Sequence, residues 1–183
     1  MSPIYLIRHG RTRANEEHLY CGSSDLPLSP GGEAELRQLH YFLPPVRFLT
    51  SGMTRTEQTL SLLFGEVPHE IRPAFREIDF GRFELHSYQE LKSDPEYLAW
   101  ISGDNHGNIP PGGESGEQME ERVLAALRRL ETENLPTVLI THGGVIACIM
   151  ACLFPEENKN RYQWQPEPGH GYAVYAGRYE RIP

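Results

Sequence analysis

The sequence predicts an α/β fold of three layers, in which helices cover both faces of a mainly parallel central sheet. Short apolar runs, which indicate buried strands, alternate along the chain with segments whose apolar residues recur at helical spacing. This alternation is typical of parallel sheets that are covered by helices on both faces. The chain has 183 residues and shows neither an internal repeat nor a linker, so we expect one domain over residues 1–183.

The first half of the chain is expected to contain three strands and two helices. The first helix is indicated by apolar residues at helical spacing from Leu36 to Leu43 and by Pro44, which disfavours its continuation. The second is indicated by Ser51, a residue type favoured at helix N-caps, and by Gly65, which would end it. In order, we predict a strand at residues 3–8, a helix at 31–43, a strand at 46–50, a helix from Ser51 to Phe64 and a strand at 67–72.

The second half contains the clearest helical pattern of the chain, over residues 115–133. Its apolar residues, from Met119 to Leu130, fall on one face, and Ser115 stands near its start. Around this helix we predict one or two short helices within residues 87–102, a strand at 136–141, an apolar helix from there to Leu153 and a last strand at 172–176.

The composition excludes several classes of protein. Lys and Arg number 17 against 25 Asp and Glu, a net charge of −8, whereas nucleic-acid binding needs a broad positive surface, so we expect no nucleic-acid partner. No apolar run approaches the roughly 20 residues of a membrane-spanning helix, and the N-terminus lacks the pattern of a secretory signal. Three cysteines do not make a disulfide framework. We therefore expect no membrane association and a cytoplasmic location.

Two histidines stand at equivalent places at the ends of predicted strands. His9 follows the first strand and His142 follows the strand at 136–141, and a glycine comes directly after each. A single histidine is more often a structural or surface residue. Two in matching places favour a site, because ligands of open α/β sheets bind beyond the carboxyl ends of the strands.

Arginines near these strand ends favour an anionic ligand. Arg8, Arg11 and Arg13 lie within six residues, which gives a local positive charge in an acidic chain. Arg55 falls in the first turn of the helix that follows the second strand. A helix N-terminus favours anions, and a guanidinium group matches the geometry of phosphate oxygens.

Together these residues belong to a set of five motifs that resembles a known family. Arg8-His9-Gly10, with Asn15 behind it, resembles the active-site motif of the histidine phosphatase superfamily, which has the phosphoglycerate-mutase-like fold. Three residues alone recur by chance, whereas five motifs in family order over nearly the whole chain are a specific match. The other four are the G-x-x-D-x-P-L loop at 22–28, the S-x-x-x-R-x-x-Q-T segment at 51–59, the acidic loop at 76–81 and the second histidine motif at 141–144.

The resemblance implies a metal-independent phosphomonoester hydrolase that acts through a phosphohistidine, without a cofactor, on a small phosphorylated metabolite. Phosphoryl transfer depends mainly on positioning and charge neutralisation, which arginine and histidine can provide. By motif position, His9 would be the nucleophile and Glu77 the general acid and base. The phosphoryl oxygens would be held by Arg8, Arg55 and His142, with Asn15 as a further contact. Additional substrate-binding residues would be Gly22, Ser23 and Glu84.

The chain departs from the family pattern after the acidic loop. Relatives often carry Trp-Glu-Gly where this sequence has Phe83-Glu84-Leu85. Two nearby carboxylates, Glu77 and Glu84, could therefore act as the acid, and motif position favours Glu77.

Three functions remain open within this family. The short chain, the Pro-Gly-Gly-Glu-Ser stretch at 111–115 and the acidic loop most resemble alpha-ribazole phosphatases of cobalamin nucleotide-loop assembly. A phosphoglycerate mutase is the first alternative, although 183 residues leave little room for the added segment of its longer relatives. A non-catalytic module that binds phosphorylated ligands is the second. The presence of the complete set of catalytic residue types counts against it.

Overall fold

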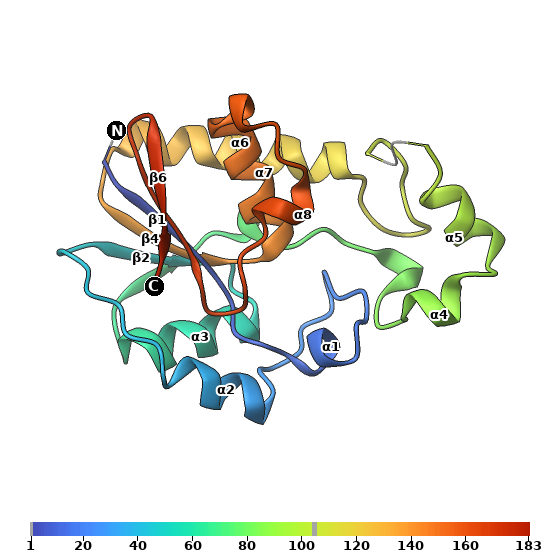
Figure 1. Ribbon diagram of the computed structural model, residues 1–183, viewed down its shortest axis with the longest axis horizontal. Coiled ribbons are helices and arrows are strands. Elements are labelled where there is room, and N and C mark those ends of the chain that lie inside the picture. Colours follow the sequence, from blue (N-terminus) through green and yellow to red (C-terminus); the bar gives the residue numbers. More distant parts are fainter. Residues whose placement is uncertain (1, 104–105) are drawn as a thin grey trace.

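A six-stranded sheet forms the centre of the computed structural model, which describes residues 2–103 and 106–183 (Figure 1). In space the strands follow the order β3-β2-β4-β1-β5-β6. The first four are mutually parallel, while β5 runs antiparallel to β1 and β6 antiparallel to β5. The predicted mainly parallel sheet is therefore confirmed. The strands are β1 (Ile4–Arg8), β2 (Arg47–Thr50), β3 (His69–Ile71), β4 (Thr137–Thr141), β5 (Gly171–Tyr175) and β6 (Arg178–Ile182).

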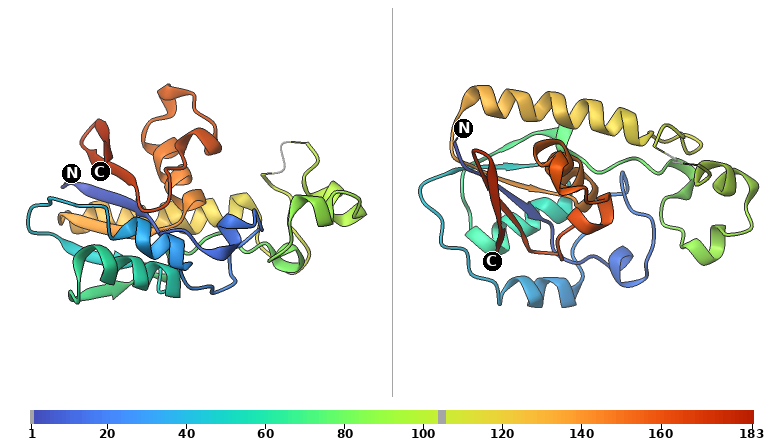
Figure 2. Two further views of the ribbon diagram at one scale, coloured as in Figure 1. Left: turned by 60° about the horizontal axis from the view of Figure 1, so that its bottom comes forward. Right: turned by 45° about the horizontal axis from the view of Figure 1, so that its top comes forward.

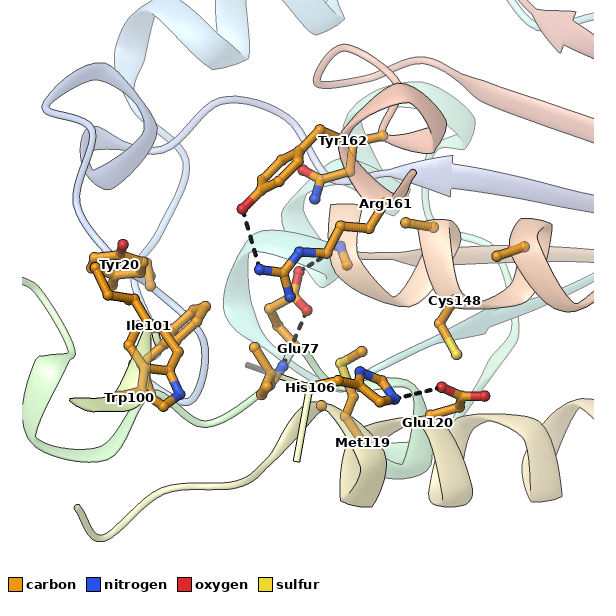
Figure 3. A pocket seen from close by; sticks show the side chains of 18 of the residues that line it. Tyr20, Glu77, Trp100, Ile101, His106, Met119, Glu120, Cys148, Arg161 and Tyr162 are labelled. Atoms are coloured by element: carbon orange, nitrogen blue, oxygen red, sulfur yellow. Dashed lines mark hydrogen bonds and ion pairs between the residues drawn. The ribbon is translucent and has the colours of Figure 1, made fainter. Parts of the chain in front are cut away.

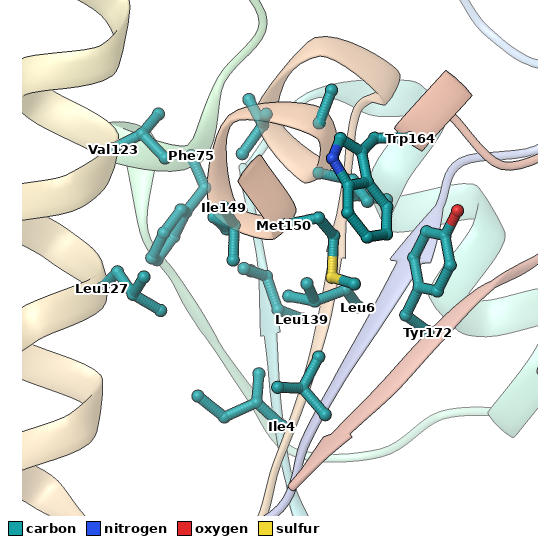
Figure 4. Close-up of a cluster of buried hydrophobic side chains, with 14 of the residues drawn as sticks. Ile4, Leu6, Phe75, Val123, Leu127, Leu139, Ile149, Met150, Trp164 and Tyr172 are labelled. Atoms are coloured by element: carbon teal, nitrogen blue, oxygen red, sulfur yellow. The ribbon is translucent and has the colours of Figure 1, made fainter. Parts of the chain in front are cut away.

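Helices cover both faces of the sheet, as Figure 2 shows, so the predicted three-layer α/β/α arrangement is also confirmed. Alternate residues of a strand point to opposite faces, and the two large clusters of apolar side chains follow this rule. Ile7 packs with Leu60 of α3 on one face, whereas Leu6 packs on the other face with α6 and α7 (Figure 4). These helices are α3 (Thr54–Phe64), α6 (Gly116–Glu133) and α7 (Gly143–Leu153).

Two short helices lie at one end of the molecule, away from the sheet (Figure 1). The prediction of one or two short helices in this part of the chain is confirmed. Each begins with a polar cap, Ser87 for α4 (Tyr88–Leu91) and Asp94 for α5 (Pro95–Trp100). They build a separate apolar cluster that is rich in aromatic rings, with Phe83, Leu91, Tyr97 and Trp100 at its centre.

The predicted helix at 31–43 was wrong beyond Leu36, where α2 (Pro30–Leu36) ends. From Leu39 to Leu43 the side chains alternate between half-buried and exposed, and Phe42 is 95% exposed. This segment is therefore extended, with a period of two that a helical pattern can imitate over five residues. The hydroxyl of Tyr41 donates to the carbonyl oxygen of Gly169 and so fixes the segment beside the end of β1.

Ser51 was also placed wrongly as an N-cap. Met53 precedes α3, and the hydroxyl of Ser51 takes part in contacts with His142 and Thr56 instead.

The strand β6 was not predicted, because most of its side chains are exposed and give little apolar signal. The other elements missing from the prediction are α1 (Arg13–Glu16), α8 (Arg161–Trp164) and three short 3-10 helices at Pro73–Phe75, Gly81–Phe83 and Pro155–Glu157.

None of the helices in the described part of the chain is long and apolar enough to cross a membrane.

Candidate active site

His9 lies at the carboxyl end of β1 and presents a defined tautomer. Its backbone N–H donates to the carbonyl oxygen of Thr141 on the neighbouring strand (2.9 Å), which fixes the position of the His9 backbone at the edge of the sheet. Its Nδ1 lies 2.7 Å from the carbonyl oxygen of Gly10. A carbonyl can only accept, so Nδ1 carries the proton and Nε2 keeps its lone pair.

The environment of His9 keeps the ring neutral. Burial lowers its pKa well below the usual 6.5, and the positive charges of Arg55 and Arg8 lower the pKa further. A neutral imidazole with an unprotonated Nε2 can act as a nucleophile at pH 7.

His142 occupies the corresponding place at the end of β4, and its ring centre lies 5.1 Å from that of His9. The structure thus brings together the two histidines that the sequence placed at strand ends. The Nε2 of His142 lies 2.9 Å from the hydroxyl of Ser51, and its Nδ1 lies 3.3 Å from the Nε of Arg55. Because a guanidinium only donates, Nδ1 accepts and Nε2 donates to Ser51. Burial lowers the pKa of His142 well below its usual value, with Arg55 as the next contribution.

Arg55 and Glu84 hold the loop at residues 22–24 from two sides. The guanidinium of Arg55, which is almost fully buried, donates to the carbonyl oxygens of Gly22 and Ser24 at 2.8 Å each. The carboxylate of Glu84 accepts from the backbone N–H groups of Gly22, Ser23 and Ser24 at 2.9–3.2 Å. The positive Arg55 thus holds the loop by its carbonyl oxygens, and the negative Glu84 holds it by its N–H groups. Direct contact of Gly22, Ser23 and Glu84 with substrate stays a prediction.

Glu77 lies beside the start of α7, the helix that follows His142. One oxygen accepts from the N–H of Gly144 in the first turn of α7 (2.9 Å), and the other accepts from its neighbour Ile78 (3.1 Å). The N–H of Phe80 adds a further donor to Glu84, whose oxygens are thus engaged by four backbone amides. Glu77, in contrast, accepts from two backbone amides.

Of the three clustered arginines, Arg8 alone turns towards the site. Its Nη1 donates to the carbonyl oxygen of Pro166 (2.8 Å), and its Nε is buried without a hydrogen-bond partner in the described chain. A buried donor of this kind is the position where a phosphate oxygen would bind. Arg11 and Arg13 instead form exposed ion pairs with glutamates.

Asn15 belongs to the short helix α1 that follows β1. Its side-chain oxygen accepts from the backbone N–H of Thr12 (3.0 Å), in the capping box of that helix. The amide NH₂ is the end of this side chain that can face a ligand.

A cavity of about 610 Å³ adjoins Arg8 and Glu77, and Figure 3 shows its walls. His9, Arg55 and His142 do not line it; these three buried side chains and Arg8, which reaches the cavity, form a separate cluster, for which we use the name phosphoryl pocket. Small residues of α7 at helical spacing leave room for the cavity on one side. The cavity is lined by Gly144, Ala147, Cys148 and Ala151 of α7, by Gly116, Met119 and Glu120 of α6, by Tyr20, Phe80, Trp100 and Ile101 opposite them, and by Arg161 and Tyr162 of α8.

Sequence reasoning did not identify these cavity walls or the role of Ser51. Ser51 lay inside a matched motif, which was a usable signal, but the walls come from helices whose order in sequence does not show that they meet. No group of three or more His, Cys, Asp or Glu within residues 2–103 and 106–183 is arranged to hold a metal ion.

A neutral buried histidine beside a second histidine and two arginines, at the carboxyl edge of a parallel sheet, is an arrangement able to bind and attack a phosphoryl group. The chain belongs to the histidine phosphatase superfamily, branch 1, whose family model matches residues 4–177. As the sequence predicted, it is a phosphatase of this superfamily.

Individual relatives include phosphatases and mutases. The adenosylcobalamin/alpha-ribazole phosphatase of Escherichia coli is 33% identical over 180 residues, which cover 93% of this chain and 88% of that protein. A putative alpha-ribazole-5'-P phosphatase of known structure, also from Escherichia coli, superposes with a TM-score of 0.84 at 26% identity, covering 98% and 94% of the two chains. The phosphoglycerate mutase structure from Thermus thermophilus gives a TM-score of 0.78 at 34% identity, with 99% and 98% covered.

Proposed function

We propose that the protein hydrolyses the phosphomonoester of a bulky alkyl alcohol that carries an aromatic base, and that this substrate is alpha-ribazole 5′-phosphate. The observation that carries the proposal is the cavity of about 610 Å³ that begins at Glu77 and is walled by Tyr20, Phe80 and Trp100. This volume falls within the usual range for sites that enclose drug-sized ligands, about 300–1,000 Å³. An aromatic base on a ribose fills such a space and packs against aromatic rings.

In the first chemical step, the Nε2 of His9 attacks phosphorus and the bond from phosphorus to the alcohol oxygen breaks. The geometry that supports this is the proton on Nδ1, held by Gly10, which leaves the lone pair of Nε2 for the attack. Glu77, at the border between the phosphoryl pocket and the cavity, donates a proton to the departing oxygen. Arg8 and Arg55, assisted by Asn15 and His142, neutralise the charge on the phosphoryl oxygens.

In the second step, water attacks the phosphorus of phosphohistidine. Glu77, now ionised, takes a proton from this water, the bond from phosphorus to Nε2 breaks, and inorganic phosphate leaves. His9 returns to its neutral form, and Glu77 is protonated again for the next cycle. One carboxylate thus serves both steps, because the leaving alcohol and the attacking water occupy the same side of phosphorus.

The cavity argues for this substrate over phosphoglycerate. Phosphoglycerate is small and carries a carboxylate, whereas most of this wall is apolar or aromatic. The named relatives with alpha-ribazole activity support the same choice. We further propose that the enzyme works in the cytoplasm on this small metabolite.

The test is phosphate release in the presence of EDTA from alpha-ribazole 5′-phosphate, 3-phosphoglycerate and glycerol 3-phosphate. We expect the highest kcat/KM for alpha-ribazole 5′-phosphate and an acid-labile phosphoenzyme in rapid-quench samples. Formation of 2-phosphoglycerate from 3-phosphoglycerate at a comparable rate would instead establish a mutase. Binding of all three without turnover would establish a phospholigand-binding module.

A further inference from the structure

Arg122, on α6, uses every N–H of its guanidinium within the protein. Nε and one N–H of Nη2 donate to the two carboxylate oxygens of Glu114, at 2.7 Å each. The other N–H of Nη2 donates to the carbonyl oxygen of Glu77 (3.1 Å), and Nη1 donates to those of Ala74 (2.9 Å) and Arg76 (2.8 Å). A planar group with five fixed donors can hold five acceptors in one geometry, which a lysine cannot do.

Three of these acceptors belong to the backbone of the loop that carries Glu77. They lie within four consecutive residues, 74–77, so Arg122 fixes the path of the chain directly before and at Glu77. The carboxylate of Glu77 then reaches the N–H of Gly144 on α7. Arg122 itself does not line the cavity, so it acts on the position of Glu77 rather than on substrate.

The Pro-Gly-Gly-Glu-Ser stretch at 111–115 explains how Glu114 reaches Arg122. The N–H of Glu114 donates to the carbonyl oxygen of Asp79 (2.9 Å), which ties this stretch to the acidic loop. A Cβ on Gly113 would lie 2.4 Å from that same oxygen, so only glycine permits the close approach. The sequence singled out this stretch for its resemblance to relatives, and the structure shows it as the partner of the acidic loop.

We propose that Arg122, held by Glu114, is a positioning residue that sets Glu77 at the distance needed to protonate the leaving alcohol. This inference rests on the proposed role of Glu77 as the general acid. A displacement of about 1 Å in a catalytic group can lower the rate about 10²-fold. Loss of the clamp should therefore slow substrates that need protonation of the leaving group, and spare those that do not.

The experiment measures kcat/KM for a series of aryl phosphates of increasing phenol acidity and for an alkyl phosphate. In the wild type we expect a shallow dependence on leaving-group acidity, and in Glu77→Gln a steep one. Arg122→Lys keeps the positive charge but cannot make five hydrogen bonds, so it should steepen the dependence on leaving-group acidity. We expect the alkyl-to-nitrophenyl ratio of kcat/KM to fall about tenfold. This is part of the rate increase of about 10²–10⁴-fold that general acid catalysis supplies. Glu114→Gln should shift the ratio in the same direction by less.

The double variant Glu77→Gln/Arg122→Lys distinguishes positioning from a general structural role. If Arg122 acts through Glu77, the double variant shows the same leaving-group dependence as Glu77→Gln alone. Arg129→Lys, an exposed arginine on the same helix, is the matched control and should keep the wild-type ratio.

Equal slowing of all substrates by Arg122→Lys, or a wild-type ratio in folded Arg122→Lys, would overturn the inference. If Arg122→Lys does not fold, a wild-type ratio in folded Glu114→Gln overturns it in the same way. A wild-type protein without turnover or phosphoenzyme would contradict the proposed function itself, which is a separate and recognisable result.

Discussion

The phosphoryl pocket and the cavity beside it are built by different means. In the pocket, His9 and His142 follow directly from neighbouring parallel strands, and within the described residues each of their ring nitrogens except Nε2 of His9 has a partner. The cavity is walled by loops and by helices α5, α6, α7 and α8, which the sheet does not hold in register. Its wall residue Tyr162 is 70% exposed.

This difference separates the chemistry of the enzyme from its choice of substrate. Backbone hydrogen bonds of a sheet place strand ends to within a fraction of an ångström, as transfer of a phosphoryl group requires. Surface loops and exposed wall residues such as Tyr162 tolerate substitution, so a new alcohol can be accommodated without disturbing the reacting atoms. The comparison predicts that pocket variants impair every phosphomonoester alike, whereas cavity variants impair only bulky ones.

The largest effect is expected for His9→Ala, which removes the nucleophile. Loss of a nucleophile in a comparable hydrolytic site lowers kcat by about 10⁶-fold. The loss should be the same for alpha-ribazole 5′-phosphate and glycerol 3-phosphate, with no phosphoenzyme in rapid-quench samples. His40→Ala, at a histidine outside the site, is the control and should behave as wild type. Substantial turnover by His9→Ala would remove the basis of the comparison.

Arg55→Ala should have the next largest effect, because it removes charge from the phosphoryl pocket and releases the 22–24 loop. Loss of one preorganised donor typically lowers kcat about 10²–10³-fold. Vanadate, which adopts the five-coordinate geometry of the transition state, should inhibit the wild type and bind this variant more weakly. Steady-state rates and vanadate inhibition measure both effects. A loss confined to bulky substrates would place Arg55 with the cavity instead.

Tyr162→Ala tests the other side of the comparison. Tyr162 is exposed and lines the cavity, so its removal should leave the fold intact. An aromatic contact contributes about 0.5–1.5 kcal/mol beyond the area it buries, which corresponds to a loss of up to about tenfold in kcat/KM for alpha-ribazole 5′-phosphate. Glycerol 3-phosphate should react at the wild-type rate. The matched control is Tyr88→Ala, an exposed tyrosine outside the cavity. A loss with both substrates would show that the two regions are not independent.

The remaining effect is on stability rather than on catalysis and concerns the two buried histidines. Their pKa values are lowered well below 6.5 in the folded protein, so below pH 6.5 the unfolded chain binds protons that the folded one does not. The free energy of unfolding therefore falls as the pH decreases below 6.5, by up to about 1.4 kcal/mol per pH unit for each histidine. NMR titration should find both imidazoles neutral at pH 6.5. Titration of either ring near its ordinary value would contradict the lowering of these pKa values by burial and by the neighbouring arginines.

The sequence by itself determined the fold class and that His9 and His142 lie together at one edge of the sheet. Apolar runs at residues 3–8 and 136–141 mark strands buried on both faces, and His9 and His142 follow each run directly. Such signals are local, because a side chain that follows a strand is carried to the sheet edge whatever the rest of the chain does. Where the local pattern was ambiguous, as at residues 37–43, the prediction failed because period two resembles a helical period over so few residues.

Only the tertiary structure decided which contacts each of several similar side chains makes. Glu77 and Glu84 are equivalent by composition, but backbone amides from the distant 22–24 loop engage Glu84, while Glu77 reaches the start of α7. In the same way, Arg122 meets residues 74–77 across more than forty positions of sequence. The cavity has no sequence signal, since its walls are brought together by packing of helices on the sheet. Contacts of this kind depend on how distant segments meet in space, which the spacing of residues along one chain does not encode.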